Sequence, residues 1–276
     1  MSDVGKVGSI PAIGYGTWNR DGDEAHNGVV RALEVGYRHI DTAEGYRNEE
    51  HVGRAIADSG VPRSDIFLTT KVAPESFGPG QIRPHVEASL EKLRTDKVDL
   101  LLLHYPSIDD EFEIEDYMAQ FAEVFDAGLT RHIGVSNFTR RYIDRALELL
   151  GDRTITTNQC EIHVYLRNRI IVEHCEAKGI PMTAYSPLAR GAVADDPLLK
   201  EIATQHGATP SQIALAFLLA EGHVVIPSSG NPERIAENFE AKDVSLSEHE
   251  VARIRKLDEG RRLIDGPWCP AWDEAA

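Results

Sequence analysis

The chain has 276 residues, 42% of them hydrophobic and 27% charged, which is typical of a soluble globular protein that buries a core without disulfides. Its net charge of −16 argues against nucleic acid and anionic membranes as main partners, because both attract positively charged surfaces. The three cysteines, Cys160, Cys175 and Cys269, show no paired spacing, and the first residues lack the apolar core of a signal peptide. We therefore expect a cytoplasmic protein without disulfides or membrane spans.

Eight short apolar runs recur along the chain, and helical patterns lie between them. The runs end near Thr17, Asp41, Lys71, His104, Ser136, Gln159, Tyr185 and Pro227. The other patterns predict helices near residues 23–34, 48–57, 79–94, 117–127, 142–150, 168–177, 198–205, 211–220, 231–240 and 247–257. The last two helices have recognisable N-caps, Asn231 and Ser247, the latter with Glu250 in a capping box.

This alternation predicts an α/β protein, a (β/α)8 TIM barrel formed by a single domain over residues 1–276. Residues 261–276 lack a helical pattern and form a C-terminal tail, which either crosses the barrel as a structural strap or flanks its mouth. Active sites of such barrels lie at the C-terminal ends of the strands, where residues far apart in sequence converge. The chain is therefore predicted to be an enzyme.

Four polar residues follow three neighbouring strands: Asp41 and Tyr46 after the second, Lys71 at the end of the third and His104 after the fourth. Strands adjacent in sequence are usually adjacent in a barrel, so these side chains should meet. A lysine beside the phenol favours the phenolate, and an aspartate keeps the lysine charged. Lowering the tyrosine pKa by about three units requires about 4 kcal/mol, which one close charge can supply. A neutral histidine can donate a hydrogen bond to a substrate oxygen, so the four residues can protonate a carbonyl.

Each of these residues also fits a structural role when it is taken alone. Asp41 fits a helix cap, His104 a hydrogen-bonded core histidine, and Lys71 the partner in a surface ion pair. Their coincidence at neighbouring strand ends favours catalysis. The four residues lack an electron source, and the segment 14–16 does not identify one, because it has no third glycine and no following helix of a dinucleotide-binding fold.

Three motifs resemble those of the aldo-keto reductases. The first spans residues 36–53 and carries Asp41 and Tyr46 at the family's spacing, and the others span residues 133–138 and 226–238. The resemblance covers the chain from about residue 11 to residue 238. Within the family it is to the bacterial 2,5-diketo-D-gluconate reductases, which also reduce small dicarbonyls such as methylglyoxal.

The resemblance implies NADPH-dependent reduction of an aldehyde or ketone such as a small dicarbonyl or keto-sugar acid. It implies Tyr46 as the proton donor, Lys71 and Asp41 as the pair that adjusts the pKa of Tyr46, and His104 as the residue that orients the carbonyl. Cofactor contacts are implied along the whole dinucleotide. Gly16, Thr17 and Trp18 are implied to line the nicotinamide end, Ser136, Asn137 and Gln159 to bind the nicotinamide carboxamide, and Tyr185 to stack on the nicotinamide ring. Ser186, Pro187 and Leu188 are implied along the pyrophosphate. Contacts to the adenosine and its 2′-phosphate are implied for Ser228, Ser229, Arg234, Glu237 and Asn238. Substrate contacts are implied for Trp18, Tyr46, Ala73, His104, Tyr105 and Trp268.

Two departures from the family pattern concern specificity. Ser228 stands where the family usually carries lysine, which weakens the preference for NADPH and makes NADH possible, whereas Arg234 keeps a cation for the 2′-phosphate. Ala73 and Tyr105 stand where relatives often carry a bulky aromatic residue and a tryptophan, so the substrate pocket differs in shape.

Two other functions stay open as alternatives. One is a non-catalytic NADP-binding protein on the same fold, and the other is a Schiff-base lyase with Lys71 as nucleophile, although Asp41 would oppose this role by holding the lysine charged. No metal is expected, because no histidine pair shows the spacing of a zinc helix. We expect a monomer whose partner is a small carbonyl compound.

Overall fold

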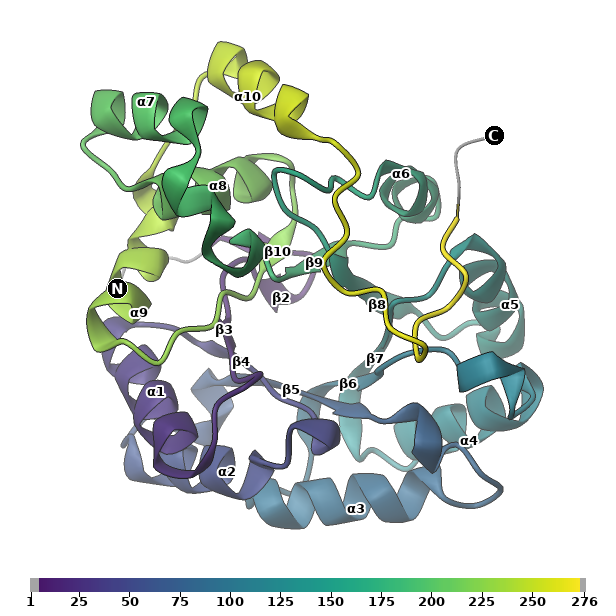
Figure 1. Ribbon diagram of the computed structural model, residues 1–276. Helices are drawn as coiled ribbons and strands as arrows, with labels where there is room; N and C mark the ends of the chain where they lie inside the picture. Colours follow the sequence, from purple (N-terminus) through teal and green to yellow (C-terminus); the bar gives the residue numbers. More distant parts are fainter. Residues whose placement is uncertain (1–4, 274–276) are drawn as a thin grey trace.

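Eight parallel strands close into a barrel in the computed structural model, which describes residues 5–273 (Figure 1). Their order in the sheet follows the sequence, and the ring closes through a parallel bridge between Ile13 and Val225. The strands are β3 (Tyr15–Gly16), β4 (His39–Asp41), β5 (Phe67–Val72), β6 (Val98–Leu103), β7 (Thr130–Ser136), β8 (Ile155–Glu161), β9 (Met182–Tyr185) and β10 (Val224–Val225). The predicted (β/α)8 barrel is confirmed, and each predicted apolar run contributes one strand.

Helices surround the barrel and bury their apolar faces, most of them against the strands, whereas α7 and α10 pack outside α8 (Figure 1). They are α1 (Gly22–Val35), α2 (Glu49–Asp58), α3 (Ile82–Leu93), α4 (Ile114–Asp126), α5 (Arg140–Leu150), α6 (Arg169–Ala177), α7 (Pro197–His206), α8 (Pro210–Ala220), α9 (Pro232–Glu240) and α10 (Glu248–Ile254). Each predicted helix forms, with ends shifted by a few residues. Both predicted N-caps are confirmed, since Asn231 accepts from the N–H of Arg234 and Ser247 forms a capping box with Glu250.

A short antiparallel hairpin of β1 (Lys6–Val7) and β2 (Ile10–Pro11) precedes the barrel, and the sequence pattern does not predict it. Two-residue strands are too short to show a period. Ile10 is fully buried in a cluster that fills the barrel interior, together with Leu100, Leu102, Val224 and Ile226. In Figure 1 the hairpin lies behind the strands, so it closes the barrel at the end opposite to its mouth.

Strand β7 approaches its neighbours closely at Gly134. A Cβ at this position would lie 2.8 Å from both the Leu102 side chain and the Thr157 carbonyl oxygen, so only glycine fits. The register between β7 and β8 shifts at this point, and Ser136 comes to lie opposite Gln159. Two residues with predicted cofactor roles are therefore side by side at the strand ends.

The C-terminal tail runs along the barrel mouth after α10 (Figure 1). The N–H groups of Glu259 and Arg261 donate to the carbonyl of Tyr165, and the N–H of Arg140 donates to the carboxylate of Asp273. Of the two alternatives, the tail thus flanks the mouth. The last part of the predicted tail, residues 274–276, lies outside the described residues.

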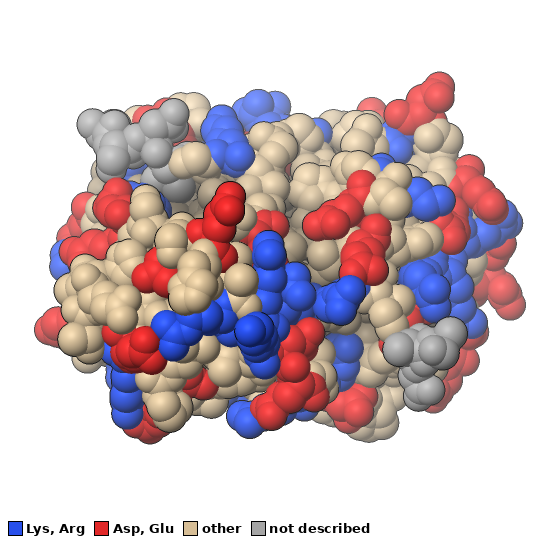
Figure 2. All heavy atoms as spheres, turned by 90° about the horizontal axis from the view of Figure 1, so that it is seen from above, with Lys and Arg blue, Asp and Glu red and all other residues tan. Residues whose placement is uncertain are grey.

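The outer face over α6, α7 and α10 gathers basic side chains at its centre, bordered by acidic ones (Figure 2). Arg253 pairs there with Glu201, while Arg167 and Arg255 both pair with Glu221. These cations are therefore matched by carboxylates. Within residues 5–273, none of the helices combines the length and the apolar composition that a membrane crossing requires.

Candidate active site

The ends of β4, β5 and β6 bring the four predicted catalytic residues together. Asp41 ends β4, Tyr46 ends the 3-10 helix η1 (Glu44–Tyr46) that follows, Lys71 is next to last in β5, and His104 follows β6. The ammonium nitrogen of Lys71 lies 2.5 Å from the Asp41 carboxylate and 3.3 Å from the Tyr46 hydroxyl oxygen. The His104 ring stands edge-on to the Tyr46 ring at 5.5 Å between centroids. The phenol thus lies beside a buried cation and an imidazole, as the strand ends predict.

Burial governs the protonation of these groups. It raises the pKa of Tyr46 well above its ordinary value, and the Asp41 carboxylate raises it further. This direction is opposite to the one expected from the sequence, because desolvation of the phenol dominates its pKa and the Lys71 charge that would lower it is paired with Asp41. Burial also lowers the pKa of Lys71, although Asp41 opposes this effect. Burial and the Lys71 charge lower the pKa of His104 well below its usual range, so the imidazole is neutral.

The buried side chain of Asn48, which the sequence analysis did not single out, connects two loops behind this group. Its amide nitrogen donates to the carbonyls of Thr17 and Arg20, both at 2.9 Å. Its oxygen accepts from the hydroxyl of Thr42, whose own carbonyl accepts from Lys71 at 2.8 Å. Asn48 therefore fixes the loop after β3 relative to the Lys71 ammonium.

Glu44, in the same turn as Tyr46, is a second residue that the sequence analysis missed. Its carboxylate accepts from the N–H of Ala73 at 2.6 Å and lies 2.8 Å from a ring nitrogen of His85. It thereby ties the turn that carries the phenol to the loop after β5. The only sequence signal is that Glu44 and Asn48 both lie within the motif around Tyr46.

Four of the residues predicted to contact the nicotinamide form a hydrogen-bonded network across β7, β8 and β9. The Tyr185 hydroxyl donates to the side-chain oxygen of Asn137 at 2.8 Å, and the Asn137 amide donates to the Ser136 hydroxyl at 3.0 Å. The Gln159 amide donates to the second oxygen of Asp41 at 2.8 Å. Gln159 thus connects this network directly to the Lys71–Asp41 pair.

The segment from Gly16 to Trp18 has a buried part and an exposed part at the barrel mouth. A Cβ on Gly16 would lie 2.9 Å from the carbonyl oxygen of Ile226, and Thr17 is fully buried with its hydroxyl donating to the Asp41 carbonyl. The next residue, Trp18, is exposed, and the Arg190 guanidinium lies 5.5 Å from the centre of its ring. Arg190 belongs to the loop that begins with the predicted pyrophosphate contacts Ser186, Pro187 and Leu188.

The predicted phosphate-binding residues lie around the N-terminus of α9. Arg234 is exposed in its first turn, and Arg20, from the loop after β3, donates to the Ser228 hydroxyl at 3.3 Å. Hydroxyl groups, a helix N-terminus and guanidinium groups are the donors that phosphates require, so this end of the mouth fits a dinucleotide. The other predicted contacts here are partly or fully buried: Ser229, Glu237 and Asn238.

Two exposed tryptophans flank the mouth. Trp18 and Trp268 are each 47% exposed, and among residues 5–273 no other large hydrophobic side chain is classed as exposed. Trp268 lies in the tail beside Tyr105, whereas Ala73 is small and half-buried at the end of β5. Exposed apolar side chains that gather at one place mark ligand-binding surfaces.

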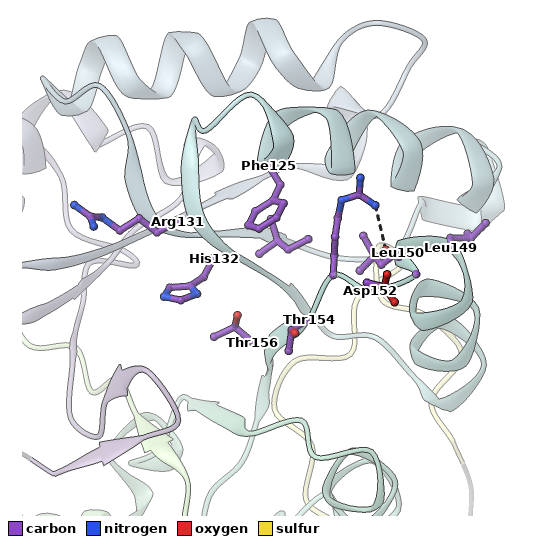
Figure 3. A pocket seen from close by; sticks show the side chains of 11 residues that line it. Phe125, Arg131, His132, Leu149, Leu150, Asp152, Thr154 and Thr156 are labelled. Atoms are coloured by element: carbon purple, nitrogen blue, oxygen red, sulfur yellow. Dashed lines mark hydrogen bonds between the residues drawn. The ribbon is translucent and has the colours of Figure 1, made fainter.

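A recess of about 580 Å³ lies elsewhere, where β7 and β8 begin (Figure 3). Its lining includes Phe125, His132, Thr154 and Thr156, and it contains none of the predicted site residues. The N-terminal end of a barrel usually serves stability, so this recess is not the active site. Across the described residues 5–273, no group of three His, Cys, Asp or Glu side chains is placed to hold a metal ion.

Comparisons with known proteins identify the family of the chain. The model of the aldo/keto reductase family matches residues 12–259. Methylglyoxal reductase DkgB of Salmonella typhi is 43% identical over 96% of this chain and 100% of its own length, and an aldo-keto reductase of Mycolicibacterium smegmatis is 40% identical over 94% of each chain.

Two solved structures share the fold. A structure named as a 2,5-diketo-D-gluconic acid reductase B has a TM-score of 0.92 at 40% identity and covers 97% of this chain and 95% of its own. The aldose reductase of Schistosoma japonicum has a TM-score of 0.88 at 35% identity, covering 93% and 91%. The chain therefore belongs to the aldo/keto reductase family of oxidoreductases.

Proposed function

We propose that the protein reduces the carbonyl group of a small aldehyde or ketone to an alcohol, with NADPH as the preferred cofactor. The observation that carries this proposal is the contact of the Tyr46 phenol with the buried Lys71–Asp41 pair beside a neutral His104. The nicotinamide of NADPH supplies the hydride when it is bound. The protein's own residues then have to hold the carbonyl oxygen and give it a proton.

Tyr46 is the proposed proton donor. Its raised pKa keeps the phenol protonated at neutral pH, so the proton is present when negative charge develops on the substrate oxygen. Neutral His104 donates a second hydrogen bond to the same oxygen and thereby orients the carbonyl. As the proton leaves Tyr46, the Lys71 ammonium at 3.3 Å stabilises the phenolate that forms.

The choice of NADPH rests on the donors around α9. The exposed guanidinium of Arg234 suits a 2′-phosphate because its planar fork can bind two phosphate oxygens. Arg20 lies against Ser228, the position where the family usually carries lysine, and brings a cation there from another loop. NADH use is proposed as secondary, because Ser228 itself contributes no charge.

The proposed substrates are small dicarbonyls or keto-sugar acids. Relatives named methylglyoxal reductase and 2,5-diketo-D-gluconic acid reductase B support this class. The pocket differs from the common family pattern at Ala73 and Tyr105, both half-buried at the mouth. A Schiff-base lyase is not favoured, because an ammonium held 2.5 Å from a carboxylate has no lone pair for attack.

The test is Tyr46→Phe, assayed by NADPH oxidation with methylglyoxal and 2,5-diketo-D-gluconate and repeated with NADH. We expect kcat to fall at least about 100-fold, which is the usual contribution of a proton donor, with an unchanged Kd for NADPH by fluorescence titration. Tyr117→Phe is the matched control, because Tyr117 lies on the buried face of α4 and its hydroxyl has no hydrogen-bond partner among residues 5–273. Full activity of Tyr46→Phe would contradict the assignment, and tight NADPH binding by the wild type without turnover would favour the non-catalytic alternative.

A further inference from the structure

A buried carboxylate at the end of β8 holds the C-terminal tail by hydrogen bonds; we call this attachment the grip. The side chain of Glu161 is fully buried, and its two oxygens accept from the N–H groups of Leu263 at 2.8 Å and Ile264 at 2.9 Å. A ring nitrogen of His163 lies 3.0 Å from one of these oxygens, and the other ring nitrogen accepts from the N–H of Tyr165. His163 therefore donates to Glu161. Hydrogen bonds to a charged acceptor are about twice as strong as neutral ones, so this is a firm attachment point.

Glu161 stands at the rim of the barrel, above the catalytic network. Alternate residues of a strand point to the same face, so its side chain lies on the face of Gln159, which donates to Asp41. Although Glu161 is close to this network along the strand, its hydrogen bonds reach toward the tail rather than toward the Lys71–Asp41 pair.

The segment 265–272, which we call the tail loop, begins directly after this attachment point. The indole N–H of Trp272 donates to Asp265 at 3.0 Å and closes the loop on itself. At its far end Asp273 pairs with Arg140 at 3.2 Å. The tail loop is therefore held at both ends.

The tail loop places Trp268 at the mouth. The indole of Trp268 lies directly on Gly266, because a Cβ at this glycine would overlap the ring. Trp268 and Cys269 lie beside Tyr105, which directly follows His104. The tail loop thus reaches the place where the proposed substrate carbonyl lies.

We propose that Glu161 is a positioning residue for the substrate: by gripping residues 263 and 264 it fixes the tail loop, so that Trp268 forms a wall of the carbonyl-binding pocket. The proposal rests on the proposed function. Loss of the grip raises the KM of the carbonyl substrate and leaves cofactor affinity unchanged, because the groups assigned to the phosphates lie around α9. Nothing in this role requires Glu161 to touch the substrate.

The experiment compares Glu161→Gln with the wild type and with Glu259→Gln, a matched change of an exposed glutamate just before the tail. A glutamine turns its NH2 group toward one of the two tail N–H groups, so one of the two hydrogen bonds is lost and the other becomes a neutral one. We expect the KM for methylglyoxal to rise at least about tenfold, the effect of losing one charged hydrogen bond, with the Kd for NADPH within about twofold. Trypsin cleavage after Arg261 and Arg262, followed by mass spectrometry, should accelerate to a similar degree in Glu161→Gln only.

A second variant, Gly266→Ala, displaces the Trp268 indole and leaves Glu161 intact. It should raise the KM without increasing cleavage after Arg262. Circular dichroism and the Kd for NADPH verify that each variant is folded. The proposal is overturned if Glu161→Gln keeps the wild-type resistance to trypsin or the wild-type KM. Failure of the proposed function has a different signature. The wild-type protein would then bind NADPH and its tail would resist trypsin, but it would reduce no carbonyl.

Discussion

Replacing Asp41 by asparagine removes the charge partner of a lysine that has no access to solvent. The Lys71 ammonium is fully buried and lies 2.5 Å from the Asp41 carboxylate. Coulomb's law gives an attraction of about 7 kcal/mol at this distance for an effective dielectric constant of about 20. The asparagine oxygen and the Thr42 carbonyl still accept hydrogen bonds from Lys71, so we expect the free energy of unfolding at pH 7 to fall by about 3–5 kcal/mol.

The pH dependence of this loss distinguishes a buried charge from a packing defect. In Asp41→Asn, burial acts on Lys71 without opposition and lowers its pKa further than in the wild type. The unfolded chain then binds one proton more than the folded chain, so the stability of the variant rises with pH up to the unfolded lysine pKa. Neutralising Lys71 relative to an unfolded pKa of about 10.4 costs about 4.6 kcal/mol at pH 7 and about 1.9 kcal/mol at pH 9.

The assay is urea unfolding followed by tryptophan fluorescence at pH 7, 8 and 9, because the midpoint and slope together give the free energy of unfolding. We expect the difference between wild type and Asp41→Asn to shrink to about 2 kcal/mol or less at pH 9. The matched control is Asp195→Asn, which breaks an exposed pair with Lys200 and should leave the unfolding curve unchanged. A loss that is the same at pH 7 and pH 9 would refute the argument.

Two further predictions concern the cofactor and the histidine. Arg234→Gln should raise the Kd for NADPH about tenfold and leave the Kd for NADH unchanged, whereas Ser228→Lys should lower the Kd for NADPH alone. The control is Arg83→Gln, an exposed change on α3. Equal shifts of Kd for both cofactors would argue against a 2′-phosphate contact. Because burial and Lys71 keep the pKa of His104 well below its usual range, kcat/KM for carbonyl reduction should show no break between pH 6 and pH 8. A break near pH 6.5 that disappears in His104→Gln would show that the imidazole titrates there.

The barrel and the positions of the four candidate catalytic residues at its mouth can be predicted from sequence for one main physical reason. A parallel strand buried on both faces is a continuous apolar run, as in the buried strand β6, and the first polar residue after such a run lies at the mouth. His104 is found in this way, after Leu100–Leu103. Asp41 and Lys71 lie in strands that already contain polar residues, and they stand out as the charged groups at the ends of those strands. Tyr46 needs the resemblance as well, because it lies in a 3-10 turn whose course follows no period.

Residues that act through long-range hydrogen bonds carry no such signal. Glu161 accepts hydrogen bonds from the main-chain N–H groups of Leu263 and Ile264, which lie more than 100 positions away along the chain. Every residue type except proline has such an N–H group, so the sequence does not identify these partners. Asn48 is similar, because two of its three partners are main-chain carbonyls. Sequence patterns record which side chains are buried, but not which backbone groups they satisfy.

The direction in which the pKa of Tyr46 is shifted shows a third limit of prediction from sequence. The residue types that form a site do not reveal how far they are removed from solvent. A cation beside a phenol lowers the phenol pKa when both are near solvent, but desolvation raises it when both are buried, and a carboxylate on the cation removes most of its field. The result suits reduction better than the acidic phenol would. A phenol with a pKa near 7 would have lost half of its protons at pH 7. The half-buried, desolvated phenol of Tyr46 instead keeps its proton until an alkoxide, which is a far stronger base, forms against it. Lys71 therefore contributes by stabilising the phenolate that proton transfer leaves behind, and not by deprotonating Tyr46 at rest.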